Sequence, residues 1–221
     1  MINELIDKQD NFEIVRDQIA AILKLNIDNQ QRLASEKGLD VSQWDFKVYS
    51  ERSNPWEDFQ ESEGGEIPIV NVWFDSLESD DAGSDTVERQ KVSGLYNIDC
   101  YAMGVSTESS EGHEPGDEVA SINVHRVARL VRNILMAGEN TYLGLRGVVW
   151  GRKVNSINVF RPSADDATIQ NIIGARLVFR VVFNETSPQV PSVKLELISV
   201  QVKRAETGEI LIKTEYQYDG T

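Results

Sequence analysis

The segment from Ala175 to Asn184 limits the possible folds of this chain more than any other feature of the sequence. One set of alternating positions is entirely apolar and holds Ala175, Leu177, Phe179, Val181 and Phe183. The other set includes Arg176, Arg180 and Asn184. Because successive side chains of a strand point to opposite faces of a sheet, this pattern predicts a half-buried β-strand. Its apolar face must be covered by a second layer of the fold.

Two segments have the spacing of amphipathic helices. The first runs from about Asn11 to Lys37, ends before Gly38, and has an apolar stripe of Phe12, Val15, Ile19, Ile22, Leu23 and Ile27. The second runs from about Asp117 to Met136, and its stripe holds Val124, Val127, Ala128, Val131, Ile134 and Leu135. Acidic residues at its start suit the helix dipole, and Gly138 follows its end. We therefore predict two helices, each with one face in the core.

Further strands are predicted around these elements. They lie at residues 45–49, 67–74, 92–103 and 148–160, and a C-terminal β-hairpin spans Val193 to Tyr218. The hairpin should turn at residues 205–208, and a phase slip in its apolar pattern predicts a bulge near Leu197–Ser199. The order of helix, strands, helix and strands predicts an α+β fold. In it, a mainly antiparallel twisted sheet carries the N-terminal helix and one long helix packed on it, with the hairpin added.

The chain is expected to divide near Pro188. Residues 1–187 should form the α+β domain, with acidic loops at 51–66, 75–88 and 106–118 that we expect to be its least ordered parts. Residues 188–221 form the hairpin extension, since Pro188 and Pro191 interrupt the chain. The hairpin either packs on its own domain or reaches a neighbouring subunit. Its candidate interface residues are Val193, Leu195, Leu197, Ile210, Ile212 and Tyr216.

Charge and cysteine content restrict the environment and the partners. The formal net charge of −14 disfavours binding to phosphate backbones and to anionic membranes. A single cysteine, Cys100, rules out an internal disulfide framework and suits a reducing compartment. The sequence contains no apolar run long enough to cross a bilayer and does not begin like a signal peptide. We therefore expect a cytosolic protein without a membrane partner.

The sequence shows no motif for catalysis, for a cofactor or for a metal. Asp80, Asp81 and Asp85 do not follow the EF-hand spacing, and His113 lies outside any zinc motif. The glycines of residues 144–147 are too few for a phosphate-binding loop, and Cys100 reads as a small buried apolar residue. We therefore expect no catalytic residue, no cofactor and no metal site, and interpret the chain as a protein that is not an enzyme.

The second helix carries a basic group on its polar side. Arg126, Arg129 and Arg132 lie there together with His125. They form either a solvated helix face or a docking face for an acidic partner, such as a neighbouring copy of this chain. A nucleic-acid face is disfavoured, because no aromatic side chains alternate with the arginines to stack on bases.

Three segments resemble the tail-terminator and neck proteins of long-tailed bacteriophages. They are the strand Tyr96-Asn97-Ile98-Asp99-Cys100-Tyr101-Ala102, the helix from Ala120 to Met136, and the strand from Ile173 to Glu185. The resemblance implies a virion structural protein, made in the host cytoplasm, that forms a homohexameric ring. Such a ring caps the tail tube, joins tail to head through neck or connector proteins, and lets DNA pass without sequence-specific binding.

The chain departs from that family in its long acidic loops and in the hairpin after Pro191. These additions leave open another neck role, as a head-completion or connector protein. A non-viral protein-binding adaptor and an unrecognised enzyme are the remaining alternatives. Ring-shaped oligomers would favour the phage protein, a stable monomer with one partner the adaptor, and an acid pair in a deep pocket the enzyme.

Overall fold

The computed structural model describes residues 6–61, 67–79, 89–109, 112–162, 171–186, 197–203 and 210–217. The chain divides into two compact units. One unit is Lys8–Ser187, and the other combines Pro188–Thr221 with Met1–Asp7. They are described separately below.

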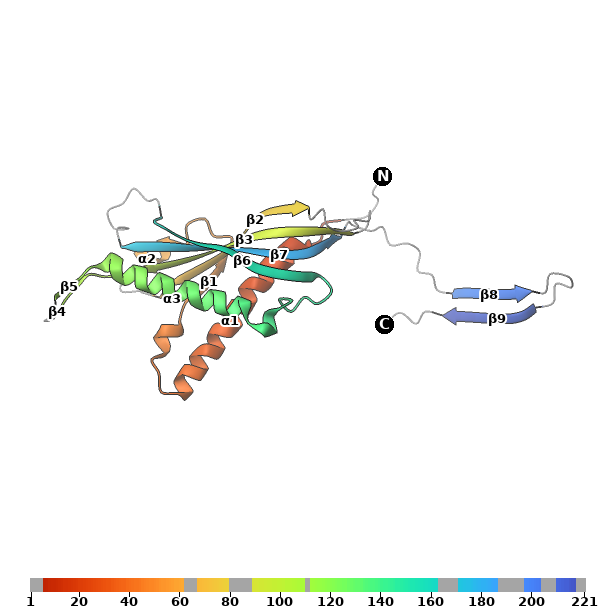
Figure 1. Ribbon diagram of the computed structural model, residues 1–221, viewed down its shortest axis with the longest axis horizontal. Coiled ribbons are helices and arrows are strands. Elements are labelled where there is room, and N and C mark those ends of the chain that lie inside the picture. Colours follow the sequence, from red (N-terminus) through yellow and green to blue (C-terminus); the bar gives the residue numbers. More distant parts are fainter. Residues whose placement is uncertain are drawn as a thin grey trace. The chain divides into compact units, whose positions relative to one another are not determined.

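A five-stranded sheet forms the centre of the first unit, in the order β1-β2-β3-β7-β6 (Figure 1). Its strands are β1 (Lys47–Ser50), β2 (Ile69–Ser79), β3 (Arg89–Met103), β6 (Val149–Phe160) and β7 (Ile172–Thr186). The pairs β2–β3, β3–β7 and β6–β7 are antiparallel, whereas β1 runs parallel to β2. The predicted α+β fold with a mainly antiparallel sheet is confirmed.

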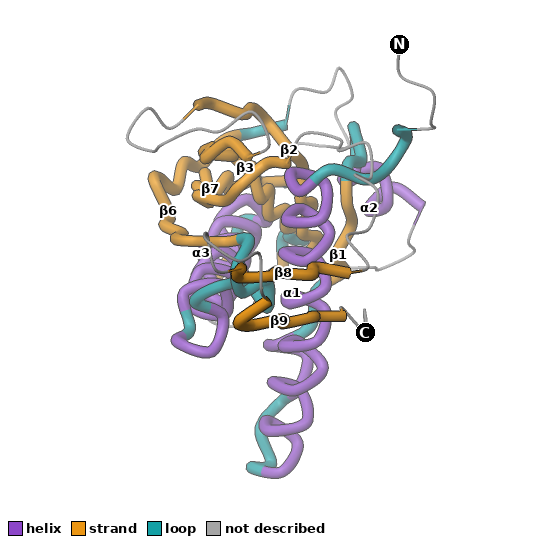
Figure 2. The backbone as a smooth tube through the Cα atoms, turned by 90° about the vertical axis from the view of Figure 1, so that its right-hand side faces the viewer, coloured by secondary structure: helices purple, strands orange, loops and turns teal. Residues whose placement is uncertain are grey.

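Two long helices cover one face of this sheet. They are α1 (Asn11–Glu36) and α3 (Gly116–Met136), and both lie on the same side of the strands in Figure 1. Figure 2 shows that α1 also extends beyond the sheet. Apart from the partly buried Phe12, the apolar stripes predicted for both helices are buried in one core with the even-numbered residues of β3 and the odd-numbered residues of β7, including Tyr96, Ile98, Leu177 and Phe179. The half-buried strand predicted for residues 175–184 thus receives its covering layer from α1 and α3.

The ends of α1 follow the predicted signals. At its start, the backbone N–H of Asp10 donates to the carboxylate of Glu13 at 3.1 Å, as in a capping box. At its end, Gly38 has a φ of +67°, and the N–H of Leu39 donates to the carbonyl of Ala34 at 2.9 Å. A glycine accepts this left-handed conformation without steric cost, so it ends the helix where the sequence indicated.

The three acidic segments are only partly loops, which corrects the prediction. Residues 51–66 include a 3-10 turn at Pro55–Glu57 and the short helix α2 (Asp58–Glu61), because Phe59 is buried and Trp56 packs against Tyr101. Residues 75–79 continue β2, since Ser76–Ser79 pair with β3 after an irregularity at Asp75. In residues 106–118, β4 (Thr107–Ser109) pairs with β5 (Gly112–Glu114) before α3 begins. Residues 62–66, 80–88 and 110–111 lie outside the described residues.

The second unit contains the predicted hairpin. β8 (Leu197–Lys203) pairs antiparallel with β9 (Ile210–Gln217), and the predicted turn lies outside the described residues. The bulge expected near Leu197–Ser199 is wrong, because those residues pair regularly with Gln217, Tyr216 and Glu215. The irregularity lies instead between Val202 and Lys203, where an extra residue in β9 interrupts the ladder.

Candidate functional site

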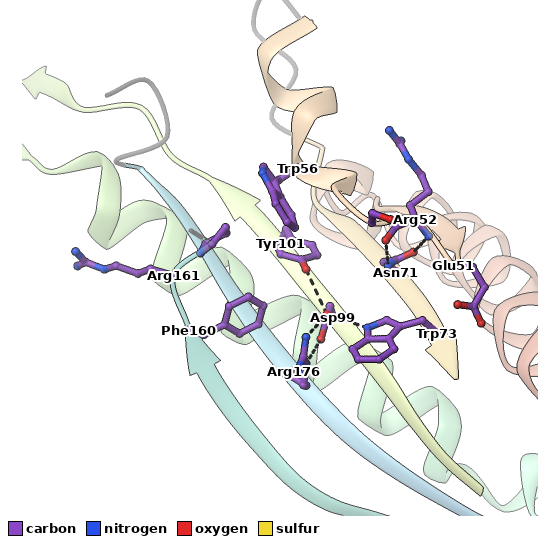
Figure 3. A pocket seen from close by; sticks show the side chains of 12 residues that line it. Glu51, Arg52, Trp56, Asn71, Trp73, Asp99, Tyr101, Phe160, Arg161 and Arg176 are labelled. Atoms are coloured by element: carbon purple, nitrogen blue, oxygen red, sulfur yellow. Dashed lines mark hydrogen bonds and ion pairs between the residues drawn. The ribbon is translucent and has the colours of Figure 1, made fainter. Parts of the chain in front are cut away.

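The face of the sheet turned away from α1 and α3, called the open face below, carries a row of polar side chains. Asn71 of β2 lies opposite Asp99 of β3, and Asp99 lies opposite Arg176 of β7. Strand alternation therefore places all three on one surface, at neighbouring positions of three adjacent strands. Trp73 and Tyr101 lie on either side of this row (Figure 3).

Asp99 is the centre of this group. Its side chain is only 3% exposed, and it accepts hydrogen bonds from Arg176 Nε at 2.7 Å and Arg176 Nη2 at 2.8 Å. Trp73 Nε1 donates to the same carboxylate at 3.0 Å, and the hydroxyl of Tyr101 lies at 3.3 Å. The bidentate Arg176 and two further donors satisfy a buried carboxylate that would otherwise be costly to bury. Burial, and then the nearby Asp99, raises the pKa of Tyr101 above its ordinary value, so its hydroxyl remains a donor.

Aromatic rings surround the guanidinium of Arg176. It lies 4.9 Å from the ring centre of Trp73 and 5.5 Å from that of Phe160. Tyr101 continues the wall, with its ring centre 5.4 Å from Trp56 and 5.8 Å from Phe160. Because Arg176 is held by Asp99 at one edge and by cation–π contacts on its faces, its orientation is set before any ligand arrives.

A short segment after β1 closes one side of the site. Asn71 fixes this segment, because its side chain accepts from the backbone N–H of Arg52 at 3.2 Å and donates to the Arg52 carbonyl at 2.8 Å. The guanidinium of Arg52 binds Asp58 at 2.7 Å, and the hydroxyl of Tyr49 donates to Asp58 at 2.5 Å. The hydrogen bond from Tyr49, aided by Arg52, lowers the pKa of Asp58, and the same bond raises the pKa of Tyr49.

Apart from those of Tyr49 and Asp58, these side chains line a hollow of about 450 Å³ on the open face. Its lining combines aromatic rings with arginines, as Figure 3 shows for Trp56, Trp73, Arg52, Arg161 and Arg176. Among the described residues no three histidine, cysteine, aspartate or glutamate side chains gather as a metal site would need. The arrangement suits recognition of a ligand by stacking and by donated hydrogen bonds.

The arginines predicted on the second helix do not share this site. Arg129 and Arg132 are exposed on α3, as is His125, whereas Arg126 is partly buried and its Nε has no hydrogen-bond partner in the described part of the chain. Arg126 contributes to lowering the pKa of Asp40, after the larger effect of the hydrogen bonds from Ser42. The three predicted arginines therefore differ in environment, since Arg129 and Arg132 are exposed and Arg126 is partly buried.

The candidate interface residues of the hairpin lie in the second unit. Leu197 is in β8, and Ile210, Ile212 and Tyr216 are in β9, where Tyr216 pairs with Ile198 and Ile212 with Val202. Val193 and Leu195 lie outside the described residues.

Cys100 is fully buried on the helix side of β3, and burial raises the pKa of its thiol, which keeps it protonated.

Sequence reasoning did not identify the hollow on the open face. A signal was present, because the polar positions of residues 92–103 and 175–184 place Asp99, Tyr101 and Arg176 on the faces opposite the apolar ones. An acid and an arginine on the polar faces of two strands meet only if those strands are neighbours in the correct register. That register is a property of the assembled sheet.

Comparison with known proteins adds no assignment. No protein-family model matches the sequence, and no curated protein is significantly similar to it. Within the described residues, none of the helices is sufficiently long and apolar to span a membrane.

Proposed function

We propose that this protein is a structural component of the neck of a long-tailed bacteriophage, where copies of the chain form a homohexameric ring. The ring caps the tail tube and joins it to the head through neck or connector proteins, and DNA passes through it without sequence-specific binding. The protein is made in the host cytoplasm and resides in the virion. The resemblance of residues 96–102, 120–136 and 173–185 suggests this role, and one structural feature supports assembly.

That feature is the outer edge of β6. Among the described strands β6 pairs only with β7, so its other side forms the end of the sheet, apart from an isolated bridge between Val149 and Arg146. The first half of β6 has two irregularities, between Val149 and Gly151 and between Val154 and Ser156. Bulges and charged side chains such as Lys153 discourage the addition of another strand.

The last five residues of β6 lack these features. Ser156–Phe160 pair regularly with β7, and Ile157 and Val159 are 44% and 53% exposed. Beside them a groove of about 700 Å³, called the edge groove below, lies between Asp117 and Ser121 of α3 and Val159 at the end of β6. A regular edge with exposed apolar side chains is a surface to which another chain can add a strand. When such a contact joins two different surfaces of identical subunits, rotation can close it into a ring.

The first prediction concerns this edge. Purified protein should run as a hexamer of the 24.8 kDa chain in light scattering coupled to size exclusion, and micrographs should show rings. Ile157→Lys should reduce the hexamer fraction, because it places a charge where a neighbouring strand would pack. Leu25→Lys is the matched control, since Leu25 is an equally apolar residue, 70% exposed on α1. A strict monomer, alone and in assembled particles, would exclude the proposed ring.

The second prediction concerns the arginines of α3. Reversing Arg129 and Arg132 to glutamate together should weaken assembly and reduce its salt dependence while the monomer remains folded, if these residues dock an acidic surface. Each exposed ion pair contributes only about 0–1 kcal/mol, so single reversals should have little effect. Adding Arg126→Glu extends the test to the partly buried position. Unchanged assembly and unchanged salt dependence would instead identify a solvated helix face.

A further inference from the structure

Three side-chain acceptors that line the open-face hollow already accept hydrogen bonds within the protein. The carboxylate of Asp99 accepts from Arg176, Trp73 and Tyr101. The side-chain oxygen of Asn71 accepts from the backbone of Arg52. Glu51 Oε1 accepts from Arg16 at 3.2 Å and from the backbone N–H of Phe74 at 3.1 Å. A ligand that donates to these three side chains would therefore compete with hydrogen bonds made within the protein.

Donors, in contrast, remain available there. Arg176 uses Nε and Nη2 for Asp99, whereas its Nη1 makes no hydrogen bond within the described residues, and its side chain is 37% exposed. Arg161 is 73% exposed, and its Nη2 lies 3.8 Å from Asp117, beyond hydrogen-bonding distance. Guanidinium groups recognise carboxylates and phosphates through paired hydrogen bonds. The hollow is thus suited to a ligand that supplies anionic acceptors together with a flat or apolar group for the aromatic walls.

We propose that this hollow binds an acidic segment of a partner protein, with a carboxylate at Arg176 and Arg161 and a neighbouring aromatic side chain against Trp56 and Phe160. The negative charge of the chain favours a protein over a nucleic acid as the ligand of the hollow. The chain has a net charge of −14, and Glu51 and Asp58 adjoin the hollow, so a polyphosphate backbone is repelled along its length. A carboxylate on a short peptide, in contrast, interacts mainly with Arg176 and Arg161 of the hollow.

The hollow also adjoins the edge groove. Phe160 and Arg161 line both, so a segment that follows the end of β6 reaches the open face without leaving the protein surface. The proposal does not depend on a ring, because a monomeric adaptor would present the same hollow. Its test is therefore independent of the oligomeric state.

The chain offers an internal control for this test, because its four tryptophans divide into two pairs. Trp56 and Trp73 line the hollow, whereas Trp44 and Trp150 do not. The guanidinium of Arg89 lies 5.7 Å from the ring centre of Trp150. Trp150 is therefore a matched control for Trp73, because both indoles have an arginine beside them. Fluorine-labelled tryptophan in the full chain, assigned by single Trp→Phe changes, gives one NMR signal for each position.

The probe is the peptide acetyl-Gly-Asp-Phe-Glu-Gly-amide, and its comparison is acetyl-Gly-Asn-Phe-Gln-Gly-amide. We expect the acidic peptide to shift the signals of Trp56 and Trp73 and to leave those of Trp44 and Trp150 unchanged. The amide peptide should bind at least about tenfold more weakly, since it lacks the charged acceptors. Arg161→Glu should weaken binding of the acidic peptide by about fivefold, whereas the exposed Arg146→Glu should not.

Three results would overturn the proposal. The first is the absence of any shift of Trp56 and Trp73 at millimolar acidic peptide. The second is equal binding of the acidic and amide peptides, which would show that the arginines do not select the ligand. The third is a shift of the same two signals by hexathymidylate at equal or lower concentration, which would assign the hollow to single-stranded nucleic acid.

Discussion

Replacing Arg176 by methionine is expected to lower the free energy of unfolding by about 3 kcal/mol, because the buried carboxylate of Asp99 would lose its charged partner. Asp99 is 3% exposed and would keep only Trp73 and Tyr101 as donors. Methionine retains an unbranched stem that can pack between Trp73 and Phe160, so the variant mainly removes the charge and the hydrogen bonds. Urea denaturation monitored by circular dichroism measures the change.

Arg180→Met is the matched control for this experiment. Arg180 lies four residues after Arg176, on the same face of β7, and donates to the hydroxyl of Ser93, not to a carboxylate. Its loss should cost about 1 kcal/mol, as expected for one hydrogen bond to a neutral group. Equal losses for the two variants would show that the Asp99–Arg176 pair has no special role in stability.

Replacing Gly104 by alanine is expected to destabilise the first unit by about 3 kcal/mol, because the added methyl group has no room. Gly104 follows β3 and lies against the start of α3. A Cβ atom there would be 2.1 Å from the carbonyl oxygen of Gly116 and 2.7 Å from the backbone nitrogen of Ala120. Both neighbours are backbone atoms, so the clash can be relieved only if α3 moves away from the sheet.

Gly138→Ala provides the comparison. No heavy atom lies within 4 Å of a Cβ built at Gly138, and this glycine does not have a positive φ. Its substitution should change stability by less than about 0.5 kcal/mol. Thermal or urea unfolding of the two variants separates a steric effect at Gly104 from a general effect of glycine replacement. A Gly104→Ala protein as stable as the Gly138→Ala protein would contradict this close contact of β3 and α3.

The two proposed contact surfaces have different physical characters. The edge of β6 offers backbone hydrogen bonds and the exposed side chains of Ile157 and Val159. The hollow on the open face instead offers arginine donors that are held in place by Asp99 and by the surrounding rings. Backbone pairing tolerates many partner sequences, whereas a preorganised guanidinium selects for an acidic group. If both surfaces are used, we expect the edge to supply contact area and the hollow to supply specificity.

Local periodicity was sufficient to predict the elements that form the core. The apolar stripes of α1 and α3 and the alternation of residues 175–184 identified buried side chains such as Val131, Ile19 and Phe179 before any fold was known. This works because a helix and a strand each impose a fixed spacing on the side chains of one face. The stop of α1 at Gly38 was predictable for the same reason, since the left-handed conformation is a local preference of glycine.

Composition was a poorer guide to the acidic segments, because the average composition of a segment does not show whether a single apolar residue in it is buried. Phe59 is buried within residues 51–66, and the backbone of residues 76–79 pairs with β3 although their side chains are mostly polar. A strand is held by its backbone hydrogen bonds as well as by its side chains. A polar composition therefore does not exclude pairing with a neighbouring strand.

Only the tertiary structure decided where the polar side chains of different strands meet. Asp99 is separated by 26 residues from Trp73 and by 77 from Arg176, and sheet order and register bring the three together. The parallel pairing of β1 with β2 and the close approach of Gly104 to α3 are likewise contacts between distant segments. Helices and strands follow from short-range preferences that a sequence displays directly. A site built across strands depends on long-range packing, which no local pattern contains.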